Sequence, residues 1–111
     1  TGQFQKAIDN LEAFSSDDEF IGSIAIGAIG DSYMELGKTE QAIDYYQKAA
    51  KNTENDLTTP LYLLKAGIAL ETKGDVQKAL DMYNEIKDKH KKSQQATEID
   101  KYIARAELKV K

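Results

Sequence analysis

The sequence predicts an all-α fold in which antiparallel helical hairpins stack side by side, and three observations support this. Helix-forming residues dominate the chain, which contains a single proline, Pro60. A pattern of small and aromatic residues recurs along the sequence. Turn and cap residues divide the chain into segments of helical length. We therefore expect one domain over residues 1–111, made of half a hairpin, two complete hairpins and a terminal capping helix.

The recurrence is the strongest of these signals, because four positions repeat at one spacing. Residues 37 positions apart pair as Gly30 with Gly67, Gly37 with Gly74, Ala42 with Ala79, and Tyr46 with Tyr83. Glycine inside a helix costs up to about 1 kcal/mol relative to alanine, so Gly30 and Gly67 indicate the close approach of a second helix. The alanines are the matching small residues on that helix, and the tyrosines fill the space beside them. Gly37 and Gly74 predict left-handed turns between the two helices.

The first element is expected to be the second helix of an incomplete hairpin, over residues 1–14. Phe4, Ile8 and Leu11 would then lack the helix against which they normally pack. We expect either fraying of this segment or a contact between two copies of the chain. A chain that starts within a repeat also predicts a fragment of a longer protein.

The first complete hairpin is expected over residues 16–52. Ser16 and Glu19 have the spacing of a capping box, which opens its first helix. Gly37 ends that helix, and Thr39 is positioned to cap the second helix.

The second complete hairpin is expected over residues 59–90. Thr59 followed by Pro60 is typical of a cap and a first-turn proline. Asp75 is positioned to cap its second helix.

The terminal helix is expected over residues 93–110, with Ser93 as its cap. Its apolar residues recur at helical spacing on one stripe, formed by Ile99, Tyr102, Ile103 and Ala106. The rest of the helix is charged, as suits a helix that shields the last hairpin from water.

The repeated positions resemble the tetratricopeptide-repeat (TPR) family, whose unit is two antiparallel helices in about 34 residues. The first hairpin matches at Ile29, Gly30, Tyr33, Gly37, Ala42, Tyr46 and Ala49, and the second at Leu63, Gly67, Gly74, Ala79 and Tyr83. The chain departs from the family in lacking its early tryptophan and its closing proline. The resemblance implies a right-handed superhelix that acts as a protein-binding scaffold and not as an enzyme.

The resemblance also implies which residues line the concave side of the superhelix. They are Ile24, Gly27, Asp31, Met34 and Glu35 from the first hairpin, and Leu61, Leu64, Ile68, Glu71 and Thr72 from the second. Together they predict an apolar groove with an acidic edge, which holds a peptide or a partner helix. It lacks the basic residues and asparagines with which TPR adaptors clamp acidic C-termini of chaperones. The alternative is a structural or oligomerisation domain, in which these residues pack on neighbouring helices and bind no peptide.

Three segments resemble, more narrowly, membrane-anchored TPR proteins of Bacteroidetes-type bacteria, which are similar to the ancillary TPR subunit of the bacterial Sec translocon. These segments are residues 30–33, 57–60 and 99–106. The resemblance implies a periplasmic domain, anchored by a membrane helix outside this chain, that assists envelope protein handling. A cytoplasmic location is the alternative.

Residue chemistry argues against catalysis, cofactors and metals. His90 is the only histidine and the chain has no cysteine, so a metal site lacks its usual ligands. Asp17, Asp18 and Glu19 lack the ligand spacing of a calcium loop. The serines have no histidine base in a plausible constellation. We expect no enzyme activity, no cofactor and no metal site.

The charge distribution argues against nucleic acid as a partner. Residues 1–86 carry a net charge of −8 and residues 87–111 a net charge of +4. The basic end has no interleaved aromatic residues or arginine cluster, and the acidic remainder would repel phosphate. No apolar run reaches the roughly 20 residues that span a bilayer, so we expect no membrane contact by this chain itself.

Overall fold

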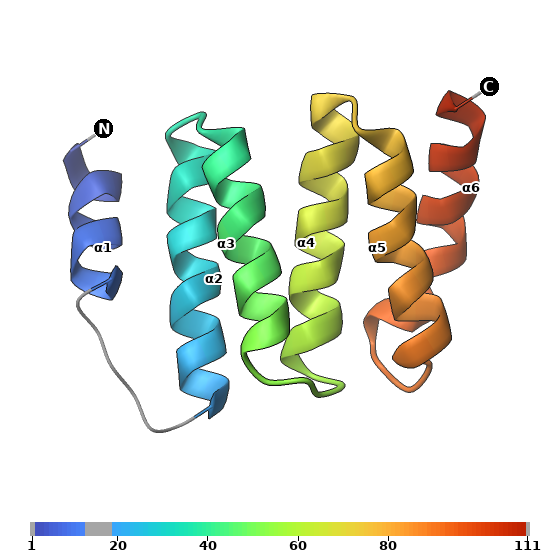
Figure 1. The fold of residues 1–111 in the computed structure, drawn as a ribbon, viewed down its shortest axis with the longest axis horizontal. Helices are drawn as coiled ribbons and strands as arrows, with labels where there is room; N and C mark the ends of the chain where they lie inside the picture. The colour runs from blue at the N-terminus through green and yellow to red at the C-terminus, as the bar shows by residue number, and fades with distance from the viewer. Residues whose placement is uncertain (1, 13–18, 111) are drawn as a thin grey trace.

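The computed structural model describes residues 2–12 and 19–110, which form a row of helices without any strand in these ranges. The elements are α1 (Gly2–Glu12), α2 (Glu19–Glu35), α3 (Thr39–Asn52), α4 (Thr58–Lys73), α5 (Val76–Lys89), the 3-10 helix η1 (Gln95–Thr97) and α6 (Ile99–Lys109). In Figure 1 the helices follow one another across the molecule in chain order. The predicted all-α fold is confirmed. No helix in the described ranges is long and apolar enough to cross a membrane.

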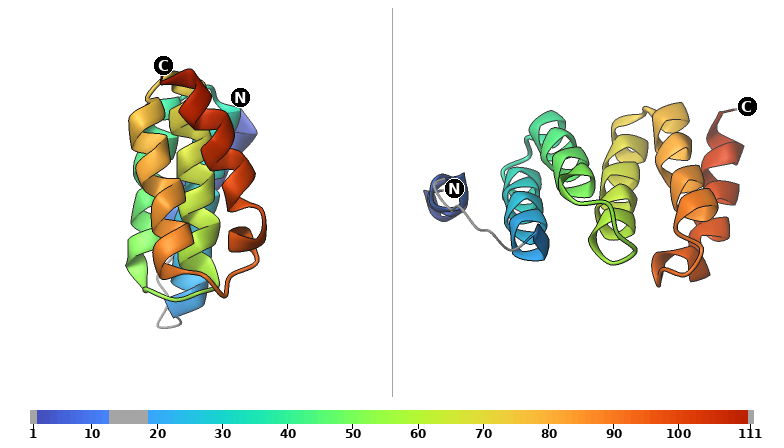
Figure 2. Two further views of the ribbon diagram at one scale, coloured as in Figure 1. Left: turned by 90° about the vertical axis from the view of Figure 1, so that its right-hand side faces the viewer. Right: turned by 60° about the horizontal axis from the view of Figure 1, so that its bottom comes forward.

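The helices form antiparallel hairpins, each packed on the next. Helix α2 pairs with α3 and α4 with α5, while α1 packs on α2 and α6 packs on α5. Helices α3 and α4 join the two hairpins, and α2 also contacts α4. Figure 2 shows the same stacked arrangement from two further directions. The first helices of the two hairpins, α2 and α4, therefore meet on one side of the row, where the TPR resemblance places the concave surface.

Close packing within each hairpin has the cause that the sequence indicated. A Cβ atom on Gly30 would lie 2.7 Å from the ring of Tyr46, and one on Gly67 would lie 2.4 Å from the ring of Tyr83. Only glycine leaves room for these rings. Ala42 is fully buried and also lies close to Gly30. Its carbonyl oxygen would lie 3.3 Å from a Cβ atom added to Gly30.

The turns within the hairpins also agree with prediction. Gly37 has φ of 76° and Gly74 has φ of 106°, in the left-handed region that favours glycine. The backbone N–H groups of Gly74 and Asp75 both donate to the carbonyl oxygen of Leu70, at 3.1 and 2.9 Å. The turn thereby satisfies carbonyl groups that the end of α4 leaves free.

The predicted caps are mostly wrong. Thr39 is the first residue of α3, and Lys38 precedes the helix without a side-chain cap. Helix α4 begins at Thr58, and Thr59 lies within its first turn. The Thr59 hydroxyl donates to the carbonyl oxygen of Ala50 at 2.9 Å, which removes it from a capping role. The predicted capping box at Ser16 lies outside the described residues.

The side chain of Asn55 takes the capping role at α4. Its Oδ1 accepts hydrogen bonds from the backbone N–H groups of Leu57, at 2.8 Å, and Thr58, at 2.6 Å. The amide group of Asn55 also donates to the carbonyl oxygen of Thr53 at 2.7 Å. The link between the hairpins is therefore ordered by one asparagine.

The last two predicted caps depart from the prediction in opposite ways: Asp75 has the expected position without the hydrogen bond, and Ser93 makes a capping hydrogen bond at η1 and not at α6. Asp75 directly precedes α5, yet it makes no side-chain cap and its carboxylate accepts from Lys73 at 2.9 Å. The Ser93 hydroxyl accepts from the backbone N–H of Ala96 at 3.2 Å, at the start of η1. Because η1 intervenes, α6 begins only at Ile99, and a continuous helix over residues 93–110 is wrong.

Both ends of the row bury an apolar stripe. On α6, Ile99, Ile103 and Ala106 are buried, as predicted. On α1, Ile8 is fully buried, and α1 packs on α2. The expectation that Ile8 lacks a packing partner is therefore wrong, because α2 supplies one. The side chain of Leu11 lies outside the described residues.

Candidate partner-binding groove

A hollow of about 430 Å³ lies over the first helices of the two hairpins. It is lined by Asp31, Met34 and Glu35 of α2, Tyr46 of α3, and Lys65, Ile68, Ala69 and Thr72 of α4. The volume falls within the roughly 300–1,000 Å³ of ordinary ligand sites. The lining combines apolar side chains with two carboxylates and one ammonium group.

Tyr46 connects the hollow to the core of the first hairpin. Its ring sits on Gly30, and its hydroxyl donates to Asp31 Oδ1 at 2.6 Å. Burial, and then the hydrogen bond to Asp31, raise the pKa of Tyr46 well above its ordinary value. The phenol therefore stays a neutral hydrogen-bond donor at all physiological pH values.

Lys65 supplies a cation that the sequence analysis missed. Its Nζ donates to both carboxylate oxygens of Asp31, at 3.0 and 3.2 Å. The ammonium also lies 5.9 Å from the centre of the Tyr46 ring. The charge of Asp31 is thus already balanced. Glu35 is exposed, and no ion pair to it occurs within the described ranges, so it is the uncompensated acid of the hollow.

The structure brings five of the ten predicted groove residues together. Asp31, Met34, Glu35, Ile68 and Thr72 all line the hollow. Ile68 is the most open of its apolar residues that carry a large side chain, at 38% exposure. These five recur about once per turn on α2 and α4, as expected of the facing side of first helices.

Four other predicted residues lie outside the hollow, for three separate reasons. Leu61 and Leu64 are half-buried and pack against the core. Gly27 is buried where a Cβ would lie 2.1 Å from the ring of Tyr62, so it serves helix packing. Ile24 is 51% exposed near the start of α2, outside the lining.

Glu71 is also not part of the open groove, because three partners enclose it. Its side chain is only 3% exposed. Arg105 donates to both of its oxygens, at 2.7 and 2.9 Å, and Lys109 and the Tyr83 hydroxyl donate at 2.6 and 2.8 Å. Hydrogen bonds from Arg105, and then from Lys109 and Tyr83, lower the pKa of Glu71 to about 2 against the opposing effect of burial.

The same hydrogen-bonded arrangement of a tyrosine, a carboxylate and a cation occurs in both hairpins. In the first, the Tyr46 hydroxyl binds a carboxylate of α2, which accepts from Lys65 of α4. In the second, the Tyr83 hydroxyl binds Glu71 of α4, which accepts from Arg105 of α6. Both carboxylates lie 34 residues before their cation. Helix α6 therefore occupies the place of the first helix of a following unit.

The stacked hairpins, with a hollow over their first helices, define a helical-repeat protein. Two sequence models of the family described as tetratricopeptide repeat match residues 25–56 and 62–93. Together they cover more than half of the chain, one on each hairpin, and the chain belongs to the tetratricopeptide-repeat family. Repeats of this family generally mediate protein–protein interactions and are typical of scaffolds without catalytic activity. No curated protein matches the chain.

Proposed function

We propose that this chain is a protein-interaction scaffold that holds a peptide or partner helix in the hollow over α2 and α4. The observation that carries the proposal is the hollow itself, which is formed by the first helices of two TPR units and lined by exposed Ile68 beside Met34 and Ala69. Apolar lining with a few polar groups is the usual composition of a binding site.

The charges of the hollow favour one kind of partner. Asp31 is balanced by Lys65, whereas Glu35 is exposed at the edge. We therefore expect a segment with an apolar anchor for Ile68 and a Lys or Arg for Glu35. Exposed ion pairs contribute only about 0–1 kcal/mol, so the apolar contact should dominate the affinity.

A synthetic helical peptide with two leucines one turn apart and an adjacent lysine tests this proposal. Its binding is followed by NMR titration of the chain, with shifts expected first at Met34 and Ile68. Ile68→Glu should weaken binding at least tenfold, while Leu108→Glu, a control at a 72% exposed position on α6, should not. Equal affinities for wild type and Ile68→Glu would overturn the proposal. Leu64→Glu is unsuitable, because Leu64 packs against the core.

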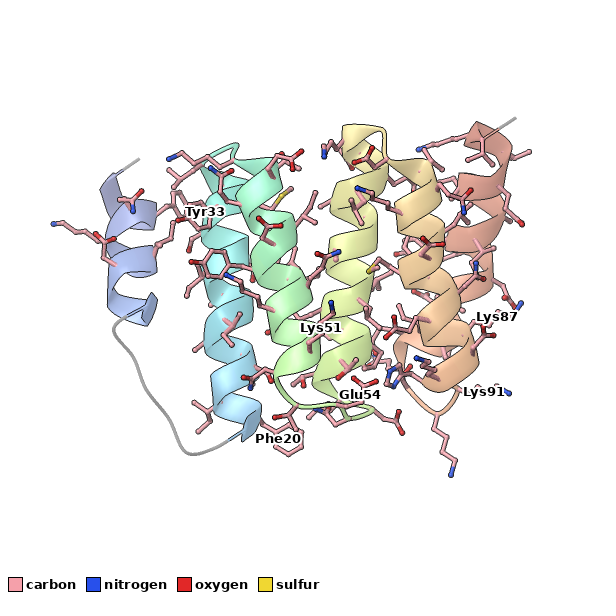
Figure 3. The ribbon with its side chains drawn as sticks, viewed as in Figure 1. Phe20, Tyr33, Lys51, Glu54, Lys87 and Lys91 are labelled. Atoms are coloured by element: carbon pink, nitrogen blue, oxygen red, sulfur yellow. The ribbon has the colours of Figure 1, made fainter. Side chains whose placement is uncertain are left out.

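The second candidate function is oligomerisation, which a patch at the start of α2 favours. Phe20, Ile21 and Ile24 are all large apolar residues with 45–51% exposure. Phe20 is labelled at the lower end of α2 in Figure 3. Self-association, through this patch or through the neighbouring α1, would appear as a concentration-dependent mass in sedimentation experiments. The double variant Phe20→Ser with Ile24→Ser should then abolish it without changing peptide binding.

We also propose a place of action in the bacterial envelope, facing the periplasm. The support is the resemblance of residues 30–33, 57–60 and 99–106 to membrane-anchored TPR proteins. Expression of the complete gene product with cell fractionation tests it. Recovery in the soluble cytoplasmic fraction would favour the alternative location.

A further inference from the structure

His90 is a buried side chain with one ring nitrogen left over. It lies at the end of α5 and is 3% exposed. Its Nδ1 lies 2.8 Å from Asp56 Oδ1. Its Nε2 is buried and has no hydrogen-bond partner in the described part of the chain. A buried nitrogen of this kind calls for an explanation, because an unsatisfied polar atom costs about 1–3 kcal/mol.

Two carboxylates lie close to the ring of His90. One ring nitrogen of His90, one oxygen of Glu54 and one oxygen of Glu85 all lie within 4.8 Å of one another. The distance from Nε2 to Glu54 Oε1 is 3.5 Å. Zinc bonds of about 2.0–2.2 Å in a tetrahedron place neighbouring ligand atoms about 3.3–3.5 Å apart. Nε2 of the histidine and Glu54 already have this separation, and an oxygen of Glu85 lies within 4.8 Å of the ligand atoms of both residues.

There is room beside the two carboxylates for an ion. Glu54 and Glu85 both line a small cavity of about 50 Å³ between the two hairpins. A space that holds one water molecule needs only about 10–15 Å³ of probe-occupied volume. The side chain of Glu54 is 61% exposed, which leaves a path from solvent.

Asp56 determines which nitrogen is free. A carboxylate accepts a hydrogen bond and does not donate one, so in a neutral imidazole the proton lies on Nδ1. Nε2, with its lone pair, then lies 3.5 Å from Glu54 Oε1, and a cation bound between the two atoms would relieve their repulsion. A carboxylate that orients a histidine in this way is the usual second partner of a metal-bound imidazole.

We propose that Glu54, Glu85 and His90 bind one divalent transition-metal ion of the zinc class, with Asp56 as the positioning residue. Imidazole favours zinc, copper and nickel over magnesium and calcium. Three protein ligands leave a fourth position for water. Glu54 belongs to the link after α3, whereas Glu85 lies on α5 and His90 directly follows it, so the ion would fasten the first hairpin to the second.

The sequence argued against a metal because His90 has neither a second histidine nor a cysteine to act with it. The fold supplies the missing ligands by bringing the α3–α4 link, with Glu54 and Asp56, against the end of α5. Lys51 lines the same cavity, so its ammonium group would compete with a metal ion for the two carboxylates. Figure 3 labels Lys51 and Glu54 close together at the lower end of α3.

Titration of the chelator-treated chain with zinc chloride in a calorimeter tests the site. We expect one ion per chain and a raised unfolding temperature on binding. The double variant Glu54→Gln with Glu85→Gln should weaken binding at least 100-fold, whereas Glu107→Gln, at an exposed position on α6, should leave it unchanged. Lys51→Met should bind at least as tightly as wild type. Absence of saturable one-to-one binding by the folded wild type would overturn the proposal, as would a double variant that binds like wild type.

The ring nitrogens of His90 give a second readout that does not depend on folding energy. In ¹⁵N NMR spectra, zinc should shift the Nε2 resonance and leave a proton on Nδ1. Asp56→Asn should weaken zinc binding about tenfold and increase the fraction of the ring that carries its proton on Nε2. A ring that keeps protons on both nitrogens at saturating zinc would show that a proton, and not a metal ion, balances the carboxylates, and would overturn the proposal.

Discussion

Each complete hairpin is closed by a tyrosine whose ring rests on a glycine and whose hydroxyl rests on a carboxylate. The ring of Tyr83 has no exposed surface, and its hydroxyl is held by Glu71 at 2.8 Å. Close packing therefore fixes the ring of this side chain, and a hydrogen bond fixes its hydroxyl group. The glycine beneath the ring therefore has little freedom to change.

Gly67→Ala should therefore destabilise the protein, although alanine is the better helix former. The added Cβ would lie 2.4 Å from the Tyr83 ring, which has nowhere to move. Overpacking costs about 1–3 kcal/mol, against a helix-propensity gain of about 1 kcal/mol. We expect a net loss of up to about 2 kcal/mol in the free energy of unfolding, measured with urea.

Gly22→Ala is the matched control, because it makes the same change inside α2. Its Cβ would meet only the amide nitrogen of Asn52, at 3.3 Å, which is the far end of an exposed side chain that donates to the Ser23 hydroxyl at 3.1 Å. We expect no loss of stability. A Gly67→Ala variant as stable as Gly22→Ala would contradict the packing argument.

The charge of Glu71 should make the stability depend on pH in the acid range. Its folded pKa of about 2 lies below its ordinary value of 4.5, so the folded state binds fewer protons than the unfolded state. The stabilisation is complete above about pH 4.5 and is lost as the pH falls towards 2. Because Arg105 and Lys109 are half-exposed and screened by water, we expect about 1–2 kcal/mol from this source.

Glu71→Gln removes the titrating group and should flatten the pH dependence in this window. Urea unfolding between pH 2 and 6 measures the difference. Asp44→Asn, at an exposed position of α3, is the control and should keep the slope of wild type. A slope that survives in Glu71→Gln would assign the acid sensitivity to other carboxylates.

At the scale of the elements, one asparagine organises the link between the hairpins. Asn55 accepts from two backbone N–H groups at the start of α4 and donates to the carbonyl oxygen of Thr53. Replacement of a capping side chain by alanine costs about 0.5–2 kcal/mol. We expect Asn55→Ala to cost about 1–2 kcal/mol in thermal or urea unfolding. Asn84→Ala, at an exposed position within α5, should cost nothing, and equal losses in both variants would refute the cap.

The helices themselves could be predicted from the sequence, whereas most of the interactions that cap their starts could not. Glycines at a fixed spacing marked the turns, since only glycine adopts the left-handed backbone there without strain. The link before α4 instead offers several possible caps in a row, including Thr53, Asn55 and Thr59. The path of the loop decides among them. Thr59 turns its hydroxyl to Ala50 of the preceding helix, a contact that no local pattern reveals.

Some of the residues that line the hollow could be predicted from the sequence, whereas the ion pair within it could not. The TPR resemblance placed Asp31, Glu35 and Ile68 on the facing side of the first helices, and all three line the hollow. The pairing of Asp31 with Lys65 was missed, because it depends on how α4 is rotated against α2. Its spacing of 34 residues, about one repeat unit, was the available signal. The convergence of Glu54 and Glu85 on His90 depends in the same way on the stacking of two hairpins.

At the scale of the whole molecule, the contacts are arranged along a line. Helix α1 packs on α2, and α6 packs on α5 and η1, whereas the middle helices have neighbours on both sides. Repeat arrays of this kind derive their stability from each unit and from its contacts with adjacent units. Local opening should therefore begin at the ends of the row and spread inwards.

Ile103→Ala tests whether this linear arrangement governs stability. Ile103 is buried on α6, and loss of a buried isoleucine side chain costs about 2–5 kcal/mol. In native-state hydrogen exchange, we expect faster exchange in α6 and in the adjoining α5, with no change in α2 and α3. Leu108→Ala is the control, since it shortens a 72% exposed side chain on the same helix and should leave exchange unchanged. If Ile103→Ala instead accelerated exchange equally in all helices, the row would open as one cooperative unit, and the effect of a substitution would not decline with distance along it.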